Sequence, residues 1–203
     1  MEQAVRARML AAMVATIAAN AQQLSEIDGA AGDGDHGINM QRGFQAAAAR
    51  AEEILAKPLP AGCTELGRTL VANVGGASGA IFGTAFMALG KSLPENPVYA
   101  DLAQALDQAI AAVKSRGRSE VGQKTMLDVL APVAAALHEG RHDIASVAQH
   151  AAEETAKLLA VRGRASFVGE RSLGHKDAGA CSAALLIAAL AGVVEERVVG
   201  EGA

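Results

Sequence analysis

The sequence predicts an all-α protein, and three features support this prediction. Alanine, the best helix former, contributes 47 of the 203 residues. Hydrophobic residues make up 51% of the chain, which excludes a disordered protein, and aromatic residues make up only 2%, which argues against a β-sandwich or β-barrel. No run of four to eight β-branched residues with alternating polarity occurs, so no sheet is expected. The length fits a single domain, residues 1–203.

Helix-breaking residues divide the chain into eight predicted helices. Asn96 before Pro97 has the composition of a helix start, and Asp143 and Asp177 each precede a helix as N-cap residues. The predicted helices, in chain order, cover residues 4–24, 37–56, 62–73, 79–92, 97–114, 125–138, 143–161 and 180–198.

The first and last helices resemble targeting segments, but both are interpreted as part of the fold. Glu2 lies among the basic residues at the start and Thr16 interrupts the apolar run, so an amphipathic helix is expected rather than a signal peptide. Residues 178–194 are uncharged, but this stretch is shorter than the about 20 residues that span a bilayer. A buried core helix is therefore expected there.

If consecutive helices run antiparallel, the connecting loops alternate between two ends of a bundle. One end then receives loops 25–36, 74–78, 115–124 and 162–179, which hold almost all of the unusual sequence chemistry. The other end receives ordinary turns and both termini. The sequence thus predicts a functional rim assembled from four loops.

Three carboxylates lie within eight residues of the segment DGAAGDGDHGIN, at Asp28, Asp33 and Asp35. Two like charges 4 Å apart repel by about 4 kcal/mol at an effective dielectric near 20, so a cation is needed to hold them together. Hard carboxylate oxygens favour Mg²⁺ or Ca²⁺ over Zn²⁺. A solvated Asp-Gly turn is the alternative interpretation.

Two further segments have features of anion-binding loops. The glycine block 75–79 precedes a helix, where free backbone N–H groups favour negative charge, although close helix packing explains such glycines equally well. The segment GRSEVGQKT nearly matches a P-loop but has one extra residue and no preceding strand. Lys124 and Thr125 at the following helix start are expected either to meet a phosphate or to cap the helix.

Basic residues gather in the long loop 162–179, at Arg162, Arg164, Arg171 and Lys176. Basic side chains on the same rim as three carboxylates suggest a polyanion bridged by metal. A nucleoside diphosphate, two Mg²⁺ ions and one or two of these side chains would bring such a site close to neutrality. A solvated basic loop is the alternative.

Several other classes of site are excluded by the sequence. A net charge of −4 and the scarcity of aromatic residues argue against nucleic-acid binding. The match of Gly32–Gly37 to a dinucleotide fingerprint lacks a preceding strand, and the HExxH match at His138–His142 is broken by Gly140. Cys63 and Cys181 form no CxxC motif and are expected to be reduced thiols. No nucleophile motif is found.

Taken together, four blocks resemble the nucleotide-binding L subunit of bacterial dihydroxyacetone kinases. They are GDGDHGINMQRGF, VGGASGAIFGT, GQKTMLDVLAPV and GRASFVGERSLGHKDAGA, they occur in the family's order, and they span about residues 26–182. The resemblance implies an eight-helix antiparallel barrel that binds ADP and two Mg²⁺ ions at one end. It departs from the family pattern at Gly34, where Ala is frequent, and at Ala178, where Pro is frequent.

The same resemblance assigns roles to individual residues. It implies that Asp28, Asp33 and Asp35 ligate two magnesium ions, and it implies no catalytic nucleophile on this chain. The residues implied to contact the nucleotide are His36, Gly37, Ile38, Asn39, Ala77, Ser78, Gly117, Thr125, Met126, Arg164, Asp177, Ala178 and Gly179.

Three functions follow as alternatives. The first is a cytoplasmic relay subunit that passes a phosphoryl group from an M subunit of the phosphotransferase system, through resident ADP, to dihydroxyacetone on a K subunit. The second is the small subunit of an ATP-dependent kinase for dihydroxyacetone or another short ketose such as a tetrulose. The third is a non-catalytic helical metal-binding scaffold. Neither nucleic acid nor a membrane is an expected partner, and homodimer formation is left open.

Overall fold

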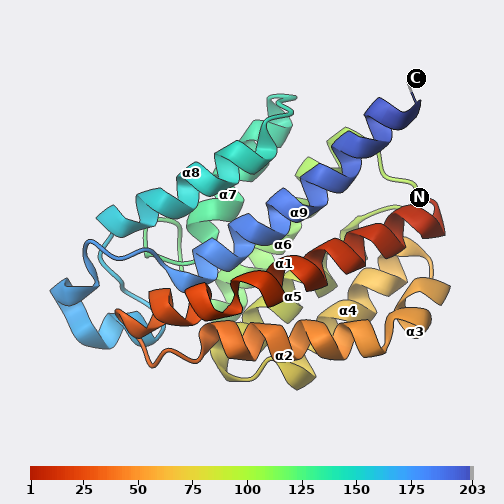
Figure 1. The fold of residues 1–203 in the computed structure, drawn as a ribbon. Coiled ribbons are helices and arrows are strands. Elements are labelled where there is room, and N and C mark those ends of the chain that lie inside the picture. Colours follow the sequence, from red (N-terminus) through yellow and green to blue (C-terminus); the bar gives the residue numbers. More distant parts are fainter. Residues whose placement is uncertain (202–203) are drawn as a thin grey trace.

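The protein is a closed ring of antiparallel helices (Figure 1). The structure, a computed structural model, describes residues 1–201 and the side chains of residues 1–195. No strand occurs in the described range. The elements are α1 (Gln3–Gly29), α2 (His36–Ala49), α3 (Ala51–Ala56), α4 (Leu59–Asn73), α5 (Gly76–Ser92), α6 (Tyr99–Gly117), α7 (Leu127–His138), α8 (Ile144–Glu154), η1 (Thr155–Lys157), η2 (Arg164–Ser172) and α9 (Ala178–Glu201).

Each long helix packs against its neighbours in the chain, and the last one closes the ring. The order around the ring is α1, α2, α4, α5, α6, α7, α8 and α9, and α9 packs against both α8 and α1. Side chains such as Ile17, Met40 and Leu70, each 0% exposed, fill the interior. Burial of these apolar groups is the main favourable contribution to folding. The predicted all-α, eight-helix antiparallel barrel is confirmed.

The two ends of the ring differ as the alternation of loops predicts. Figure 1 shows the turn after α1 and the η2 segment at one end, with the N-terminus and the C-terminal end of α9 at the other. Side-chain contacts join the loops of the first end: His36 with Ser78, Asp33 with Arg164, and Lys124 with His175. All four predicted rim loops therefore converge.

The predicted helix 37–56 is wrong in its middle, where the chain breaks at Arg50 into α2 and α3. Local propensity favours a continuous helix there, since the segment is rich in Ala and Glu. Arg50 instead adopts a non-helical conformation (φ −108°, ψ 17°), and its guanidinium donates to Thr69 (2.7 Å) and Glu65 (2.7 Å) on α4. Packing of α3 against α4 thus overrides the local preference.

Other predicted boundaries also need correction. The first helix, expected to end at residue 24, continues to Gly29, so Asp28 lies on the helix and not in the loop. The helix expected to start at Pro97 begins at Tyr99, because the Asp101 carboxylate accepts the Val98 N–H (2.8 Å) and sets the start there. Asn96 instead accepts a hydrogen bond from the N-terminal ammonium. The helix expected over 143–161 ends at Glu154, because the carbonyls of Thr155 and Leu158 turn toward the ammonium of Lys124.

Helices α1 and α9 are each long and apolar enough to cross a membrane by length and composition. Both lie within the closed ring, where α9 buries Ala180, Ala183 and Leu186. Burial is greater in α9, with 44% of its most apolar stretch buried, than in α1, with 28%. The packing of α9 agrees with the expectation that residues 178–194 form a core helix.

Glu65 connects three basic side chains near the end of the ring opposite the rim loops. Its side chain is 9% exposed, and its carboxylate lies 2.7 Å from Arg50, 2.8 Å from Lys57 and 3.5 Å from Arg68. Hydrogen bonding to Lys57 and then to Arg50, against the opposing effect of burial, holds the pKa of Glu65 below its ordinary value. The ionised carboxylate of Glu65 therefore stabilises the folded state.

Replacing Glu65 by Gln is expected to lower Tm at pH 7 by about 2–4 °C. A carboxyl group whose pKa is depressed on folding stabilises the protein above its unfolded pKa, and this contribution disappears as the pH falls through the folded pKa. The Tm difference between wild type and Glu65→Gln should therefore be constant down to about pH 5 and shrink below about pH 4.5. Thermal melts across this range test it, and a difference that grows in acid would contradict it.

Candidate functional site

Three carboxylates form the centre of the rim. Asp28 lies in the last turn of α1, and Asp33 and Asp35 lie in the turn that leads into α2. One ligand oxygen from each lies within 4.8 Å of the others, and Asp33 and Asp35 are exposed. Asp28 also shapes the turn, because its Oδ2 atom accepts the N–H groups of Asp35 (3.1 Å) and His36 (3.4 Å). The sequence-predicted aspartates are thus brought together.

Glycines allow this turn to close tightly around Asp28. A Cβ atom at Gly32 would lie 2.6 Å from the Asp28 Oδ1 atom and 2.9 Å from its carbonyl oxygen. Gly34 has a positive φ of 74°, a conformation that L residues with a side chain adopt only at a cost. Glycine therefore suits the backbone at position 34, where the family often has Ala.

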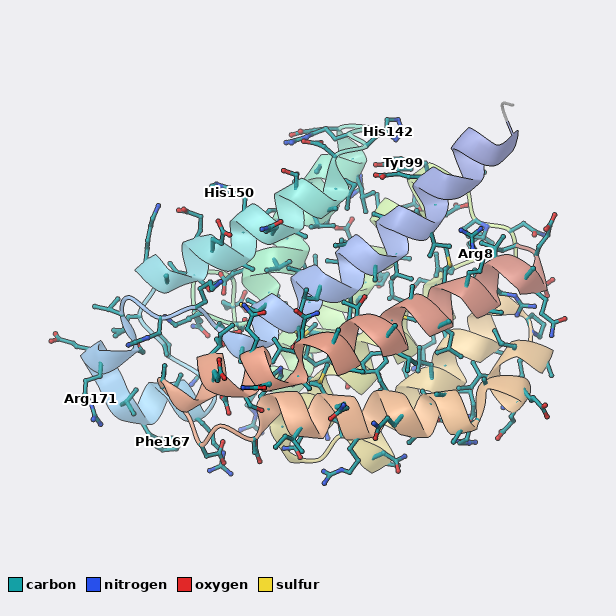
Figure 2. All side chains as sticks on the ribbon, in the orientation of Figure 1. Arg8, Tyr99, His142, His150, Phe167 and Arg171 are labelled. Atoms are coloured by element: carbon teal, nitrogen blue, oxygen red, sulfur yellow. The ribbon has the colours of Figure 1, made fainter. Side chains whose placement is uncertain are left out.

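The basic loop faces the carboxylates, as the sequence predicts. The Arg164 Nε atom, at the start of η2, lies 3.0 Å from the Asp33 Oδ2 atom. Arg162 and Arg171 of the same loop are exposed and Lys176 is half-buried. Figure 2 shows Arg171 and Phe167 pointing away from the barrel. Phe167 is 88% exposed. The rim therefore combines a carboxylate cluster, a facing guanidinium and an exposed aromatic side chain.

His36 joins three helices beneath the carboxylates. Its imidazole is 6% exposed, and its Nδ1 and Nε2 atoms lie 3.0 Å from Ser78 Oγ on α5 and 2.7 Å from Ser182 Oγ on α9. Burial lowers the pKa of His36, although the charges of Asp28 and Asp35 oppose this effect. The ring is therefore held neutral, and both of its nitrogens are engaged by serine hydroxyls.

The glycine block forms the start of α5, beside the carboxylate turn. Arg42, on α2, donates hydrogen bonds to the carbonyls of Asn73 (2.8 Å) and Val74 (2.8 Å), which lie just before this block, and to the Asn39 side chain (3.0 Å). The N-terminal N–H groups of a helix favour negative charge. The α5 N-terminus thus offers a surface for an anion next to the aspartates, with Ala77 exposed and Ser78 half-buried in its first turn.

Of the two alternatives for Lys124 and Thr125, a phosphate contact by Lys124 does not fit the structure. Lys124 is 1% exposed, and its ammonium donates to the backbone carbonyls of Thr155, Leu158, Ser172 and His175. The alternative, a helix cap in this segment, fits better: Asp128 accepts the Thr125 N–H (2.7 Å) and the Gly122 N–H.

Asp177 occupies the junction between the basic loop and α9. Its Oδ1 atom accepts the Ala180 N–H at 2.7 Å, which confirms the predicted N-cap. Burial raises the pKa of Asp177 to about 7, and the nearby charges of Asp128 and Asp28 add to this rise. The Asp177 carboxyl is therefore partly protonated near neutral pH, and a cation bound nearby would favour its ionised form.

The thirteen residues that the resemblance links to a nucleotide divide by accessibility. Four are buried, namely His36, Gly37, Met126 and Ala178. The other nine are exposed or half-buried and lie on the rim loops or the helix ends next to them: Ile38, Asn39, Ala77, Ser78, Gly117, Thr125, Arg164, Asp177 and Gly179. Their roles toward a ligand stay predictions.

Several supporting residues were missed by the sequence analysis. Ser182, the partner of His36, has no motif around it. Arg42 lies inside the block GDGDHGINMQRGF, but nothing in the sequence indicates that its side chain reaches the carbonyls before α5. Asp128 stands three residues after Thr125, and the spacing of a capping box was a signal that would have identified it.

The donor set suits magnesium. Three clustered carboxylates supply the hard oxygen ligands that Mg²⁺ prefers, and no sulfur or imidazole ligand belongs to the cluster. A separate groove of 680 Å³ lies between α7 and α8, lined in part by Pro132, Val147 and His150. The groove includes none of the three aspartates, so the rim remains the candidate site.

Comparisons with known proteins agree with this geometry. The family model described as the DAK2 domain matches residues 30–192. The ADP-binding subunit DhaL of PEP-dependent dihydroxyacetone kinase 1 from Listeria innocua is 42% identical over 177 residues, which cover 84% of this chain and 86% of that protein. The L-erythrulose kinase of Pectobacterium atrosepticum is 41% identical over 193 residues, which cover 88% of this chain but only 32% of that protein.

A solved structure shares the fold. The dihydroxyacetone kinase of C. freundii, in complex with AMP-PNP and Mg²⁺, superposes with a TM-score of 0.76 and 25% sequence identity over 95% of this chain and 34% of that chain. The match to the family model covers most of the ring and two of the three clustered aspartates, Asp33 and Asp35, while Asp28 lies two residues before its start. The chain belongs to the DAK2 domain family.

Proposed function

We propose that this chain is the ADP- and magnesium-binding subunit of a dihydroxyacetone kinase. It would act in the cytoplasm with partner subunits and relay a phosphoryl group from a phosphotransferase-system M subunit, through bound ADP, to dihydroxyacetone on a K subunit. The carboxylate cluster of Asp28, Asp33 and Asp35, faced by Arg164 on a rim of four loops, is the observation that carries the proposal. The similarity to a PEP-dependent DhaL subunit over 86% of its length supports it.

The residues of the rim suit this task by position and charge. Asp28, Asp33 and Asp35 would hold two Mg²⁺ ions, which neutralise phosphate oxygens when bound. Arg164 would turn from Asp33 toward the phosphates, and the N-terminus of α5 would add backbone N–H groups. Phosphoryl transfer of this kind depends mainly on positioning and charge neutralisation, so no protein nucleophile is required.

The rim also suits partner docking. Transfer requires the donor and acceptor sites of the partner subunits to reach the phosphates, and Ile38 (61% exposed) and Phe167 (88% exposed) offer apolar contact area beside the site. Exposed aromatic side chains are frequent anchors of protein interfaces. We therefore place the partner surface at the rim rather than at the end with the chain termini.

The similarity to an L-erythrulose kinase favours a second candidate function. That relative is about three times as long as the matched segment, which covers 32% of it. Under this alternative the chain would be the small subunit of an ATP-dependent kinase for a short ketose, with exchangeable ATP in place of resident ADP.

Nucleotide analysis of the protein purified alone separates these functions. The protein is denatured, any released nucleotide is identified by chromatography and mass spectrometry, and magnesium is quantified. Near-stoichiometric ADP that survives dialysis is the expected result for the relay. A site that is empty but exchanges ATP would favour the ATP-dependent kinase, and failure to bind either nucleotide with Mg²⁺ would overturn both in favour of a non-catalytic scaffold.

A further inference from the structure

A single buried ammonium closes the base of the basic loop. Lys124 Nζ donates to the carbonyl oxygens of Thr155 (3.0 Å), Leu158 (3.1 Å), Ser172 (2.6 Å) and His175 (2.6 Å). The first two carbonyls precede residues 159–171 in the chain and the last two follow them. We call these four residues the neck and residues 159–171 the rim loop.

The neck depends on Lys124 more than on any other side chain that lines it. An ammonium has three N–H donors, so the four carbonyls share its full hydrogen-bonding capacity. The other bonds across the neck have neutral donors and acceptors. They run from the Gly174 N–H to Ala156 O (2.8 Å), from the Ala160 N–H to Ser172 Oγ (3.1 Å) and from the Asp177 N–H to Thr155 Oγ1 (3.0 Å). Hydrogen bonds from a charged donor contribute more than neutral ones, especially when buried.

Beyond its neck, the described part of the chain holds the rim loop through one backbone hydrogen bond, from the Val161 N–H to the Gln123 carbonyl (3.4 Å), and through two exposed side-chain contacts. These two contacts are the Arg164–Asp33 ion pair (3.0 Å) and the hydrogen bond from Arg162 to the Arg118 carbonyl (2.7 Å). Exposed pairs of this kind add little to stability. The position of Arg164 over the carboxylates is therefore set mainly at the neck.

The backbone conformation at Lys124 is unfavourable for a lysine, which indicates that the side chain is needed at this position. Lys124 has a φ of 61°, in the left-handed region that favours glycine. A non-glycine residue persists there when its surroundings require it, at a modest cost in conformational energy. The side chain, rather than the local backbone preference, explains a lysine at this position.

We propose that Lys124 is a positioning residue that locks the rim loop over the site and so sets how long the nucleotide stays bound. The inference rests on the proposed function, because it assigns the lock to the Mg²⁺·ADP site. It concerns the residence time of the nucleotide rather than the chemistry of transfer.

Lys124→Met tests the lock, since it keeps the apolar stem and removes the ammonium. Limited trypsin digestion followed by mass spectrometry measures loop opening, because the rim loop contains Arg162, Arg164 and Arg171. Release of a fluorescent ADP analogue in Mg²⁺ buffer, chased with excess ADP, measures residence time. Both rates are expected to rise about 10- to 100-fold, the effect of losing a buried charged hydrogen-bond donor.

Glu65→Gln is the matched control. It also removes a buried charged centre that binds several partners, but Glu65 lies toward the opposite end of the barrel beside Lys57. This variant should lose thermal stability while its loop cleavage and nucleotide release stay at wild-type rates. If it accelerates both rates as much as Lys124→Met does, the effect reflects general destabilisation and the inference is overturned.

Ser172→Ala keeps the test decisive if Lys124→Met does not fold. It removes only the Ala160–Ser172 bond of the neck and leaves the carbonyl partners of Lys124 in place. We expect both rates to rise about 2- to 5-fold. Wild-type rates in this variant would overturn the inference, as would faster cleavage without faster release. Absence of Mg²⁺·ADP binding in the wild type would instead refute the proposed function, while trypsin cleavage would still test the neck.

Discussion

Replacing Asp33 by Ala is expected to weaken Mg²⁺·ADP binding by about 100-fold or more, since loss of a group that only hydrogen-bonds to a metal ligand already costs about 10- to 100-fold. Asp33 supplies one of three carboxylates whose oxygens lie within 4.8 Å of one another, and its side chain is exposed toward solvent. Its removal takes away a ligand without opening a cavity in the core. Isothermal titration with Mg²⁺·ADP measures the loss, and circular dichroism should show that the helices persist.

The metal-free protein should respond to this substitution in the opposite direction. Removing one of three clustered negative charges relieves repulsion, whereas the exposed ion pair with Arg164 contributes about 1 kcal/mol or less. The Tm of the metal-free variant should therefore equal or exceed that of the wild type. A destabilised metal-free variant would mean that Asp33 serves the fold rather than a cation.

Asp107→Ala is the control for this experiment. Asp107 is an exposed aspartate that also pairs with one basic side chain, His138 at 2.8 Å, but it lies on α6 away from the carboxylate cluster. Its loss should leave Mg²⁺·ADP affinity unchanged. Wild-type affinity in Asp33→Ala would show that this carboxylate is not a ligand, and our assignment of the cluster would fail at that residue.

The parts of the site that the sequence predicts share one property: they are local or follow from helix order. The three aspartates, Asp28, Asp33 and Asp35, lie within eight residues. Their closeness in the sequence keeps them near one another in space, whatever the position of this turn in the fold. The convergence of the four loops needs only the number of helices and their alternation. The break of the second helix at Arg50 did not disturb this inference, because α3 is short and lies at the opposite end of the barrel.

The parts that the sequence did not predict depend on contacts between distant segments. A lysine followed by a threonine at a helix start has the same appearance whether the ammonium faces a phosphate or a buried carbonyl. What decides the case for Lys124 is where residues 155–175 pass, 31 to 51 positions later in the chain. The same applies to His36, whose second serine partner is 146 residues away.

Replacing Gly37 by Ala is expected to destabilise the fold by about 3 kcal/mol or more, at the upper end of the cost of overpacking. Gly37 lies in the first turn of α2, and an added Cβ atom would lie 1.8 Å from the Ala21 carbonyl oxygen and 2.8 Å from the Ser25 nitrogen of α1. Both are backbone atoms, so no side-chain rotation relieves the clash. Urea unfolding followed by circular dichroism measures the change.

Gly192→Ala provides the comparison, because Gly192 lies inside α9 with no atom within 4 Å of an added Cβ. There the higher helix propensity of Ala should stabilise the protein by about 0.5–1 kcal/mol. If Gly37→Ala lowers the free energy of unfolding and Gly192→Ala raises it, packing and not helix propensity decides the effect at Gly37. These results would also support a packing role for Gly37, which the family resemblance links to the nucleotide, because its missing Cβ lets α2 approach α1. If Gly37→Ala were as stable as Gly192→Ala, that close approach would be wrong.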